Sequence, residues 1–190
     1  MFLGDEFQVK SGLVVSRKKA KDSNTAKFNY KQLNLRSINK NGYLEMSELE
    51  TLFTEDAINS EYLTTFGDVI VRLTDPYTAV YITKEYEDLV ITSNFAIIRG
   101  NNNYNSEFLA YYFNGDGVKK QLYSNMQGAV IKSVNIASIE NVVLPKISLR
   151  KQKLYSQLMG AVIQKLKKIE KIKNLELKLQ KHIIEKMSQE

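Results

Sequence analysis

Few residues in this sequence have the types and spacing that catalysis or metal binding requires. The chain contains no cysteine and a single histidine, His182, which excludes thiolate nucleophiles, Cys-ligated zinc and any pair of histidine ligands. His182 has no serine or carboxylate at the spacing of a catalytic motif, and the acids Glu45, Glu48 and Glu50 follow no metal-ligand or nuclease pattern. We therefore predict no catalytic residue and no bound metal, and we interpret these side chains as solvated surface.

One glycine-rich loop has the spacing of a cofactor-binding turn, Phe113-Asn114-Gly115-Asp116-Gly117. It fits the F-x-G-x-G pattern with which many methyltransferases hold S-adenosylmethionine. Such a loop should follow an apolar strand, whereas the residues before this one predict a helix, and helices commonly end in glycine. The Asn/Asp-Pro-Pro-aromatic motif of amino-methyltransferases is excluded, because the only prolines are Pro76 and Pro145. We predict no cofactor, and a methyltransferase-like enzyme is the weaker alternative.

The charges are unevenly distributed along the chain, although the total is only +6. Residues 9–43 contain nine basic groups and one acid, residues 44–89 contain eleven acids and two basic groups, and residues 149–190 contain eleven basic groups and four acids. Two basic segments thus flank an acidic middle, which favours a protein with one face for phosphate and other faces that avoid it. Nucleic acid is the partner that this distribution predicts.

The composition is that of a globular protein, with 43% hydrophobic residues in 190. No apolar run approaches the ~20 residues that a bilayer crossing needs, and Met1–Glu6 lacks the basic start and apolar stretch of a secretory signal. We expect a cytoplasmic protein that does not cross a membrane. Attachment of a basic helix to a membrane surface is an alternative that the charges leave open.

The elements that must position any functional residue fall into two regions. Up to about residue 148, alternating apolar residues and turn signals predict short strands and two short helices. Asn41-Gly42 is a strong turn signal, and Pro76 precedes a hairpin partner. The predicted strands are Phe7–Lys10, Phe28–Ile38, Val69–Leu73, Tyr77–Ile82, Leu89–Ile91, Phe95–Ile98 and Ile139–Leu144, and the predicted helices are Ser106–Phe113 and Val118–Tyr123.

The last forty residues predict one long amphipathic helix. From Leu149 to about Met187 the sequence has no proline and one glycine, Gly160. Apolar residues recur at spacings of three, four and seven, which is typical of a coiled coil. At 1.5 Å per residue the helix would be roughly 60 Å long, so it needs a second helix to cover its apolar side. The predicted dimerisation side consists of Tyr155, Leu158, Val162, Ile169, Ile172, Leu179 and Ile183.

A series of segments follows one another in a recognisable order before the long helix: Leu3–Gly12 with Ser16–Lys18, Tyr62–Ile70, Glu107–Phe113, Gln127–Lys132 and Ile139–Pro145. No single segment is specific alone, but their order covers nearly the whole chain. This order resembles the specificity (S) subunits of type I restriction–modification systems. Gln152 lies where these proteins usually have a glutamine that opens the spacer helix.

The resemblance implies a DNA-reading subunit without catalysis of its own, bound to a DNA methyltransferase (modification) subunit and to a restriction subunit. A typical member is about twice as long, with two recognition domains and two spacer helices. This chain has one of each, so we expect either a homodimer that restores the full arrangement or a truncated, exchangeable half. The stretch from Pro145 to Gln152 departs from the family pattern, which puts docking onto the methyltransferase subunit in doubt.

We therefore expect an α+β fold, with a β-rich target recognition domain at residues 1–148 and a long coiled-coil-like spacer or dimerisation helix at residues 149–190. Basic side chains would contact phosphates, while Asn, Gln and Arg side chains would read base edges of double-stranded DNA. An independent dimeric DNA-binding regulator is the alternative function. The predicted DNA-binding residues are Arg17, Lys18, Lys19, Lys21, Lys27, Lys31, Arg36, Arg72, Gln127 and Lys132.

Overall fold

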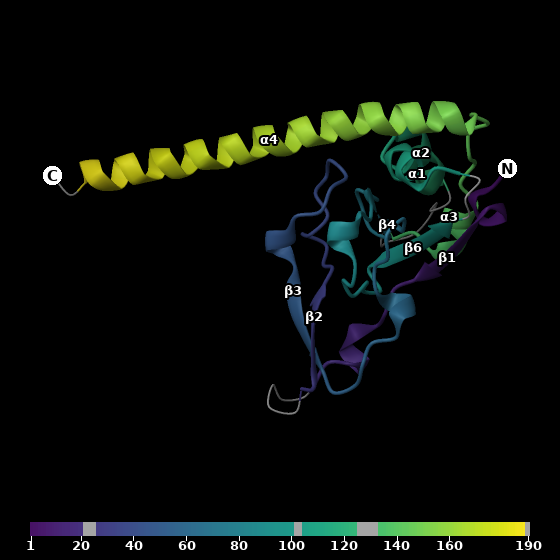
Figure 1. The fold of residues 1–190 in the computed structure, drawn as a ribbon, viewed down its shortest axis with the longest axis horizontal. Coiled ribbons are helices and arrows are strands. Elements are labelled where there is room, and N and C mark those ends of the chain that lie inside the picture. The colour runs from purple at the N-terminus through teal and green to yellow at the C-terminus, as the bar shows by residue number, and fades with distance from the viewer. Residues whose placement is uncertain (21–25, 101–103, 125–132, 189–190) are drawn as a thin grey trace. The chain divides into compact units, whose positions relative to one another are not determined.

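The computed structural model describes residues 1–20, 26–100, 104–124 and 133–188 (Figure 1). It is an α+β fold with a β-rich N-terminal part and a long C-terminal helix, as expected. The chain divides into two compact units, Met1–Ser156 and Gln157–Glu190. None of the helices in the described part of the chain combines the length and apolar composition that a membrane crossing needs.

A four-stranded antiparallel sheet forms the centre of the first unit, with the strand order β1-β6-β4-β5. Its two middle strands are almost continuously apolar because both faces of the sheet are covered. Successive residues, such as Val69 and Ile70, point to opposite faces and belong to different core clusters. The strands are β1 (Phe7–Ser11), β4 (Val69–Arg72), β5 (Ala79–Tyr81) and β6 (Phe95–Gly100).

Three short helices cover one face of this sheet: α1 (Ser106–Phe113), α2 (Asp116–Ser124) and α3 (Ile136–Glu140). Loop residues cover the other face, including the fully buried Leu33 and Ile82. The sheet therefore has a helical side and a loop side. Leu33, on the loop side, directly follows a strand of the second sheet.

The second sheet is a two-stranded antiparallel ribbon of β2 (Phe28–Gln32) and β3 (Glu50–Thr54), which we call the β2–β3 ribbon. Figure 1 shows it as a separate pair of strands beside the four-stranded sheet. Its inner side packs onto a small apolar cluster that contains Leu52, Ile58 and Val90. Tyr30 also lies on this side and accepts a hydrogen bond from the backbone N–H of Ile58 at 3.2 Å.

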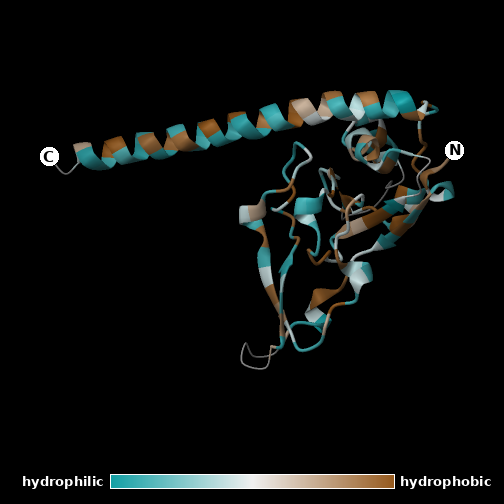
Figure 2. Cartoon of the chain, in the orientation of Figure 1, coloured by the Kyte–Doolittle hydropathy of each residue, from teal (hydrophilic) through white to brown (hydrophobic). Residues whose placement is uncertain are grey.

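The long helix, α4, spans Leu149–Met187, a length of 39 residues, which confirms the predicted bounds. Figure 2 shows apolar residues recurring along its whole length between polar ones. All seven residues of the predicted dimerisation side are exposed in the single chain, from Tyr155 at 44% to Leu179 at 58%. The apolar side of this helix is thus available for another helix.

Four predicted strands were wrong in part or whole. The predicted strand Tyr77–Ile82 is reduced to β5, Ala79–Tyr81. The predicted strand Phe28–Ile38 ends at Gln32, because Asn34 accepts hydrogen bonds from the backbone N–H groups of Arg36 and Ser37 and closes a turn. Leu89–Ile91 forms only isolated bridges through Val90 rather than a strand. Its backbone N–H groups donate alternately to two segments, to Thr64 and Tyr62 on one side and to Lys31 on the other, so no continuous ladder forms.

The fourth error concerns Ile139–Leu144. The Asn135 side chain accepts a hydrogen bond from the backbone N–H of Ser138 and caps α3, so the segment begins as helix. Only Val143 makes a bridge, to Phe2. Strand β3 was missed altogether, although Leu52 and Thr54 alternate as buried residues with exposed Thr51 and Phe53.

Candidate nucleic-acid interface

Three of the predicted DNA-binding residues lie together beside the β2–β3 ribbon. Arg17 ends a short 3-10 turn, Val15–Arg17, and exposed Lys18 and Lys19 follow it. Lys19 forms an antiparallel bridge with Thr54 at the end of β3. The next residue, Ala20, donates its backbone N–H to the carbonyl oxygen of Phe53 at 2.9 Å. The segment after Arg17 is therefore fixed along the free edge of β3.

Lys27 approaches the same point from the other strand. Its backbone N–H donates to the carbonyl oxygen of Thr54 at 3.0 Å, just before β2 begins. Thr54 thus connects the backbones at Lys19 and Lys27, although the two lysines are eight positions apart in the sequence. We call the exposed set Arg17, Lys18, Lys19 and Lys27 the basic end of the ribbon.

The net charge at this end is positive. Among the residues that the structure describes, no ion pair is found for any member of the basic end. Lys31 adds a fifth cation in β2, and its Nζ donates to Thr51 Oγ1 across the ribbon at 3.0 Å. Among the described residues at this end, the four members of the basic end stand against two carboxylates, Glu55 and Asp56, which directly follow β3. The excess of two positive charges, with Lys31 further along β2, suits a polyanion.

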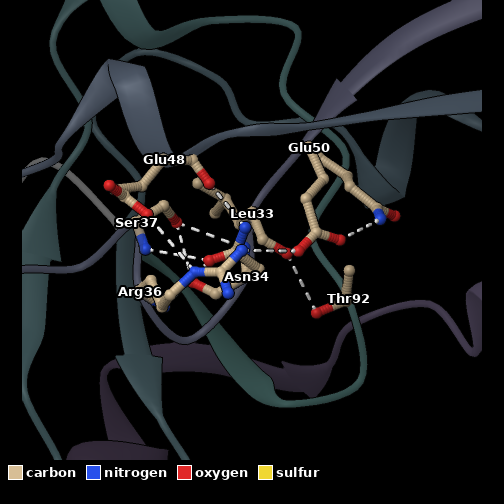
Figure 3. A network of polar contacts seen from close by, with 8 residues as sticks. Leu33, Asn34, Arg36, Ser37, Glu48, Glu50 and Thr92 are labelled. Carbon is tan, nitrogen blue, oxygen red and sulfur yellow. Dashed lines mark hydrogen bonds and ion pairs between the residues drawn. The ribbon is translucent and has the colours of Figure 1, made fainter.

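Arg36 has a different environment, at the opposite end of the ribbon (Figure 3). Its guanidinium pairs with Glu48 at 3.2 Å and with Glu50 at 3.3 Å. Asn34 Nδ2 donates to the carbonyl oxygen of Glu48, which ends the separate 3-10 turn Met46–Glu48. Two carboxylates offset the charge of Arg36, so we expect this residue to hold the turn rather than to contact phosphate.

Arg72 lies in β4 of the four-stranded sheet and not in the ribbon. Its Nη2 donates to the carbonyl oxygen of Asp75 at 3.2 Å, and Nε is buried without a hydrogen-bond partner among the described residues. Desolvation lowers the pKa of this guanidinium from its usual value, against the opposing effect of the Asp75 charge. The structure does not bring Arg72 into the ribbon. The predicted Lys21, Gln127 and Lys132 lie outside the described residues.

The glycine-rich loop follows helix α1, as expected, and not a strand. Asn114 Oδ1 accepts a hydrogen bond from the backbone N–H of Ala79, and its Nδ2 donates to the carbonyl oxygen of the same residue at 2.9 Å. The Asn114 side chain therefore pairs with both backbone groups of Ala79 at the edge of β5, as a neighbouring strand would. This loop joins two helices and fixes them to the sheet.

A hollow of about 700 Å³ lies between the end of β6 and the start of α4, and its lining includes the cations Arg99 and Lys153. Arg99 pairs with Asp68 through both carboxylate oxygens, at 2.9 and 3.0 Å. It also donates to the carbonyl oxygens of Glu61 and Leu63. These bonds use most of its N–H donors within the fold, so Arg99 stabilises the loop before β4. Over the described ranges, no cluster of three or more metal-ligating side chains is found.

Buried polar groups join the first turns of α4 to the rest of the first compact unit. Gln152 and Ser156 are each 2% exposed. Gln152 Oε1 accepts from the backbone N–H of Asn105 at 2.9 Å, and its Nε2 donates to the carbonyl oxygen of Ile147 at 2.8 Å. Ser156 Oγ donates to Asn105 Oδ1 at 2.7 Å. We call Asn105, Gln152 and Ser156 the polar clamp.

No family model and no curated protein sequence matches this chain. Solved structures of similar fold do match. One is the HsdS subunit from Thermoanaerobacter tengcongensis, with a TM-score of 0.65 at 16% identity over 90% of this chain. A second comes from a structural study of complex assembly and conformational transition of the type I R-M system, with a TM-score of 0.65 at 15% identity. A third is the type I restriction–modification S subunit from M. genitalium, with a TM-score of 0.57 at 15% identity over 90% of this chain.

The chain spans about two fifths of the length of these proteins, 43% of the first two and 40% of the third. The match covers both the β-rich part and much of the long helix. The resemblance noted in the sequence is confirmed at the level of the fold: the chain folds like part of a type I restriction–modification specificity subunit.

Proposed function

We propose that this chain recognises double-stranded DNA for a type I restriction–modification complex in the cytoplasm and has no catalytic activity itself. In this proposal residues 1–148 form the recognition domain and residues 149–190 form the spacer helix. A DNA methyltransferase subunit and a restriction subunit would bind it and perform the chemistry. The observation that carries the proposal is the basic end of the ribbon, on a fold shared with HsdS subunits.

A homodimer is the second part of the proposal, because the exposed apolar side of α4 needs a partner helix. The charges along α4 favour an antiparallel pair. Residues 149–168 contain six basic groups and no acid, whereas residues 169–190 contain five basic groups and four acids. A parallel pair would place the two strongly basic halves together, while an antiparallel pair places each beside a half that contains carboxylates.

An independent dimeric DNA-binding regulator would share the basic end and the exposed side of α4. The two functions differ in their partners. A specificity subunit co-purifies with the modification subunit and changes the pattern of methylated sites in cells, whereas a regulator does neither. Methylome mapping of cells with and without the chain therefore separates the two functions.

The first prediction concerns the basic end. The double variant Lys18→Glu with Lys19→Glu should lower affinity for a duplex at least tenfold, because it removes cations that would neutralise phosphates. Each lost phosphate contact should also reduce the dependence of the logarithm of affinity on the logarithm of salt concentration by about 0.9. Fluorescence anisotropy over a salt series measures both quantities.

The matched control is Lys119→Glu with Lys120→Glu, which makes the same charge change on α2. If the two double variants lose affinity equally, only net charge matters and the basic end is not the contact surface. Circular dichroism should show both variants folded.

A further inference from the structure

The outer side of the β2–β3 ribbon is exposed along both strands. Residues directly opposite each other in an antiparallel pair point to the same side of the sheet. In this register Asn29 is opposite Phe53, and Lys31 is opposite Thr51. All four are exposed, whereas Leu52 and Thr54 on the inner side are buried. The inner face is thus buried at Leu52 and Thr54, whereas the outer face is exposed at all four positions.

The four outer side chains have the chemistry of base recognition. Asn29 has an amide that both donates and accepts, Lys31 has a cation, Thr51 has a hydroxyl and a methyl group, and Phe53 has an apolar ring that is 40% exposed. Glu50 is the one carboxylate within β2 and β3. It lies opposite Gln32 in the register of the inner side and pairs with Arg36. The four outer side chains therefore include no carboxylate, while Glu55 and Asp56 follow just beyond the end of β3.

The dimensions of a ribbon suit the major groove of duplex DNA. Two paired strands lie about 4.8 Å apart, and the groove, about 12 Å wide, admits a two-stranded ribbon. Outward residues on one strand are about 6.7 Å apart, which is close to two base-pair steps of about 3.4 Å. Asn29 and Lys31 would thus reach bases two steps apart, and the face would span about three base pairs.

The basic end lies where a ribbon in the groove would need it. Lys19 and Lys27 join the strands at Thr54, one residue beyond the Asn29–Phe53 pair. Cations at the end of an inserted ribbon meet the phosphates that line the groove, so they fix its depth and register. Positioning and reading would then come from adjacent parts of one small sheet.

We propose that the outer face of the β2–β3 ribbon, formed by Asn29, Lys31, Thr51 and Phe53, reads base edges in the major groove. Asn29 is the adenine reader and Lys31 the guanine reader, while Thr51 and Phe53 contact thymine methyl groups. The hydrogen bond from Lys31 Nζ to Thr51 Oγ1 keeps the cation on this face before DNA arrives. The inference rests on the proposed function and specifies the residues that would supply its specificity.

The test is selection of preferred sites from a random duplex pool by the full-length chain, followed by the same selection with variants. Asn29→Ala should lose the preference at one base pair by about 5- to 150-fold, the discrimination expected from one bidentate contact. Asn29→Lys should change the preferred base at that position from adenine to guanine. The control Asn141→Ala alters an exposed asparagine after α3 and should leave the consensus unchanged.

Affinity for an unrelated duplex and its salt slope should stay the same in Asn29→Ala, because a base contact releases no counterion. If both Asn29 variants fold and select the wild-type consensus, the inference is overturned. The proposed function would still stand in that case, provided that Lys18→Glu with Lys19→Glu weakens binding. If the wild-type chain selects no consensus and binds no duplex, the proposed function fails and this inference fails with it.

Discussion

Gln152 shows how one buried side chain can connect two helices that are distant in sequence. It satisfies the backbone N–H of Asn105, and the Asn105 side chain in turn caps α1 by accepting from the N–H of Phe108 at 2.7 Å. Such bonds matter most through the cost of losing one partner, since the other is then buried and unpaired.

We expect Gln152→Ala to lower the free energy of unfolding by about 1–3 kcal/mol, because the Asn105 N–H and the Ile147 carbonyl lose their partner. Urea denaturation followed by circular dichroism measures this change. Gln157→Ala is the matched control, five residues further along the same helix at an exposed position, and should change stability by less than about 0.5 kcal/mol. Equal effects from the two variants would show that the polar clamp contributes no stability of its own.

The sequence indicated Gln152 but not its role. The resemblance placed it at the opening of the spacer helix, and the helix does begin three residues earlier, at Leu149. Its partner, Asn105, lies 47 positions away, and no local pattern connects the two. For the same reason the ion pairs of Arg36 with Glu48 and Glu50 could not be predicted, so Arg36 resembled the other basic residues of its segment.

At the scale of elements, the predictions succeeded where periodicity was strong and local. The apolar strands β4 and β6 are buried on both faces, and α4 has a long regular repeat. They failed where a short polar side chain accepts hydrogen bonds from nearby backbone N–H groups and so ends a strand or starts a helix. Asn34 does so after β2, and Asn135 does so at α3. Strand β3 was missed because it carries only Leu52 as a fully buried aliphatic residue.

The missed strand matters for the candidate site. Without β3, the cations of residues 17–31 formed a basic segment with no known shape. With it, Lys19 and Lys27 meet at Thr54, and Phe53 and Thr51 join Asn29 and Lys31 on one face. The charge could thus be read from the sequence, whereas the surface it belongs to depends on strand pairing.

A prediction at this scale concerns the exposed side of α4. Leu158→Asp with Ile172→Asp should convert the proposed dimer to a monomer at micromolar concentration, because buried carboxylates have no partner in an apolar helix pair. Light scattering of the purified chain measures the mass.

The matched control is Gln164→Asp with Asn174→Asp, which adds the same two charges at exposed positions outside the repeat. It should leave the mass unchanged. A wild-type chain that is monomeric at high micromolar concentration would contradict the homodimer proposal directly.

At the scale of the whole molecule, a two-fold related dimer would read the same half-site twice, in inverted orientation. We therefore expect an interrupted palindrome as the target of the homodimer. Duplicating residues 169–175 adds one heptad and keeps the apolar repeat in phase.

This duplication lengthens each helix by about 10 Å, which corresponds to about three base pairs. The unread gap in the selected site should grow by that amount, and both half-sites should stay as they were. Site selection with the lengthened chain provides the measurement. A gap of unchanged length would mean that α4 does not set the distance between reading domains, and an asymmetric target for the unaltered chain would mean that a different second domain completes the reader.

The position at which the first compact unit ends has a consequence for how such chains can be recombined. That unit runs to Ser156 and includes the first two turns of α4. A hybrid joined at residue 148 would combine Asn105 from one parent with Gln152 and Ser156 from another, whereas a junction after Ser156 transfers all three together. New DNA specificities assembled from two parents should therefore express and fold best when the crossover lies inside the helix and not at its beginning.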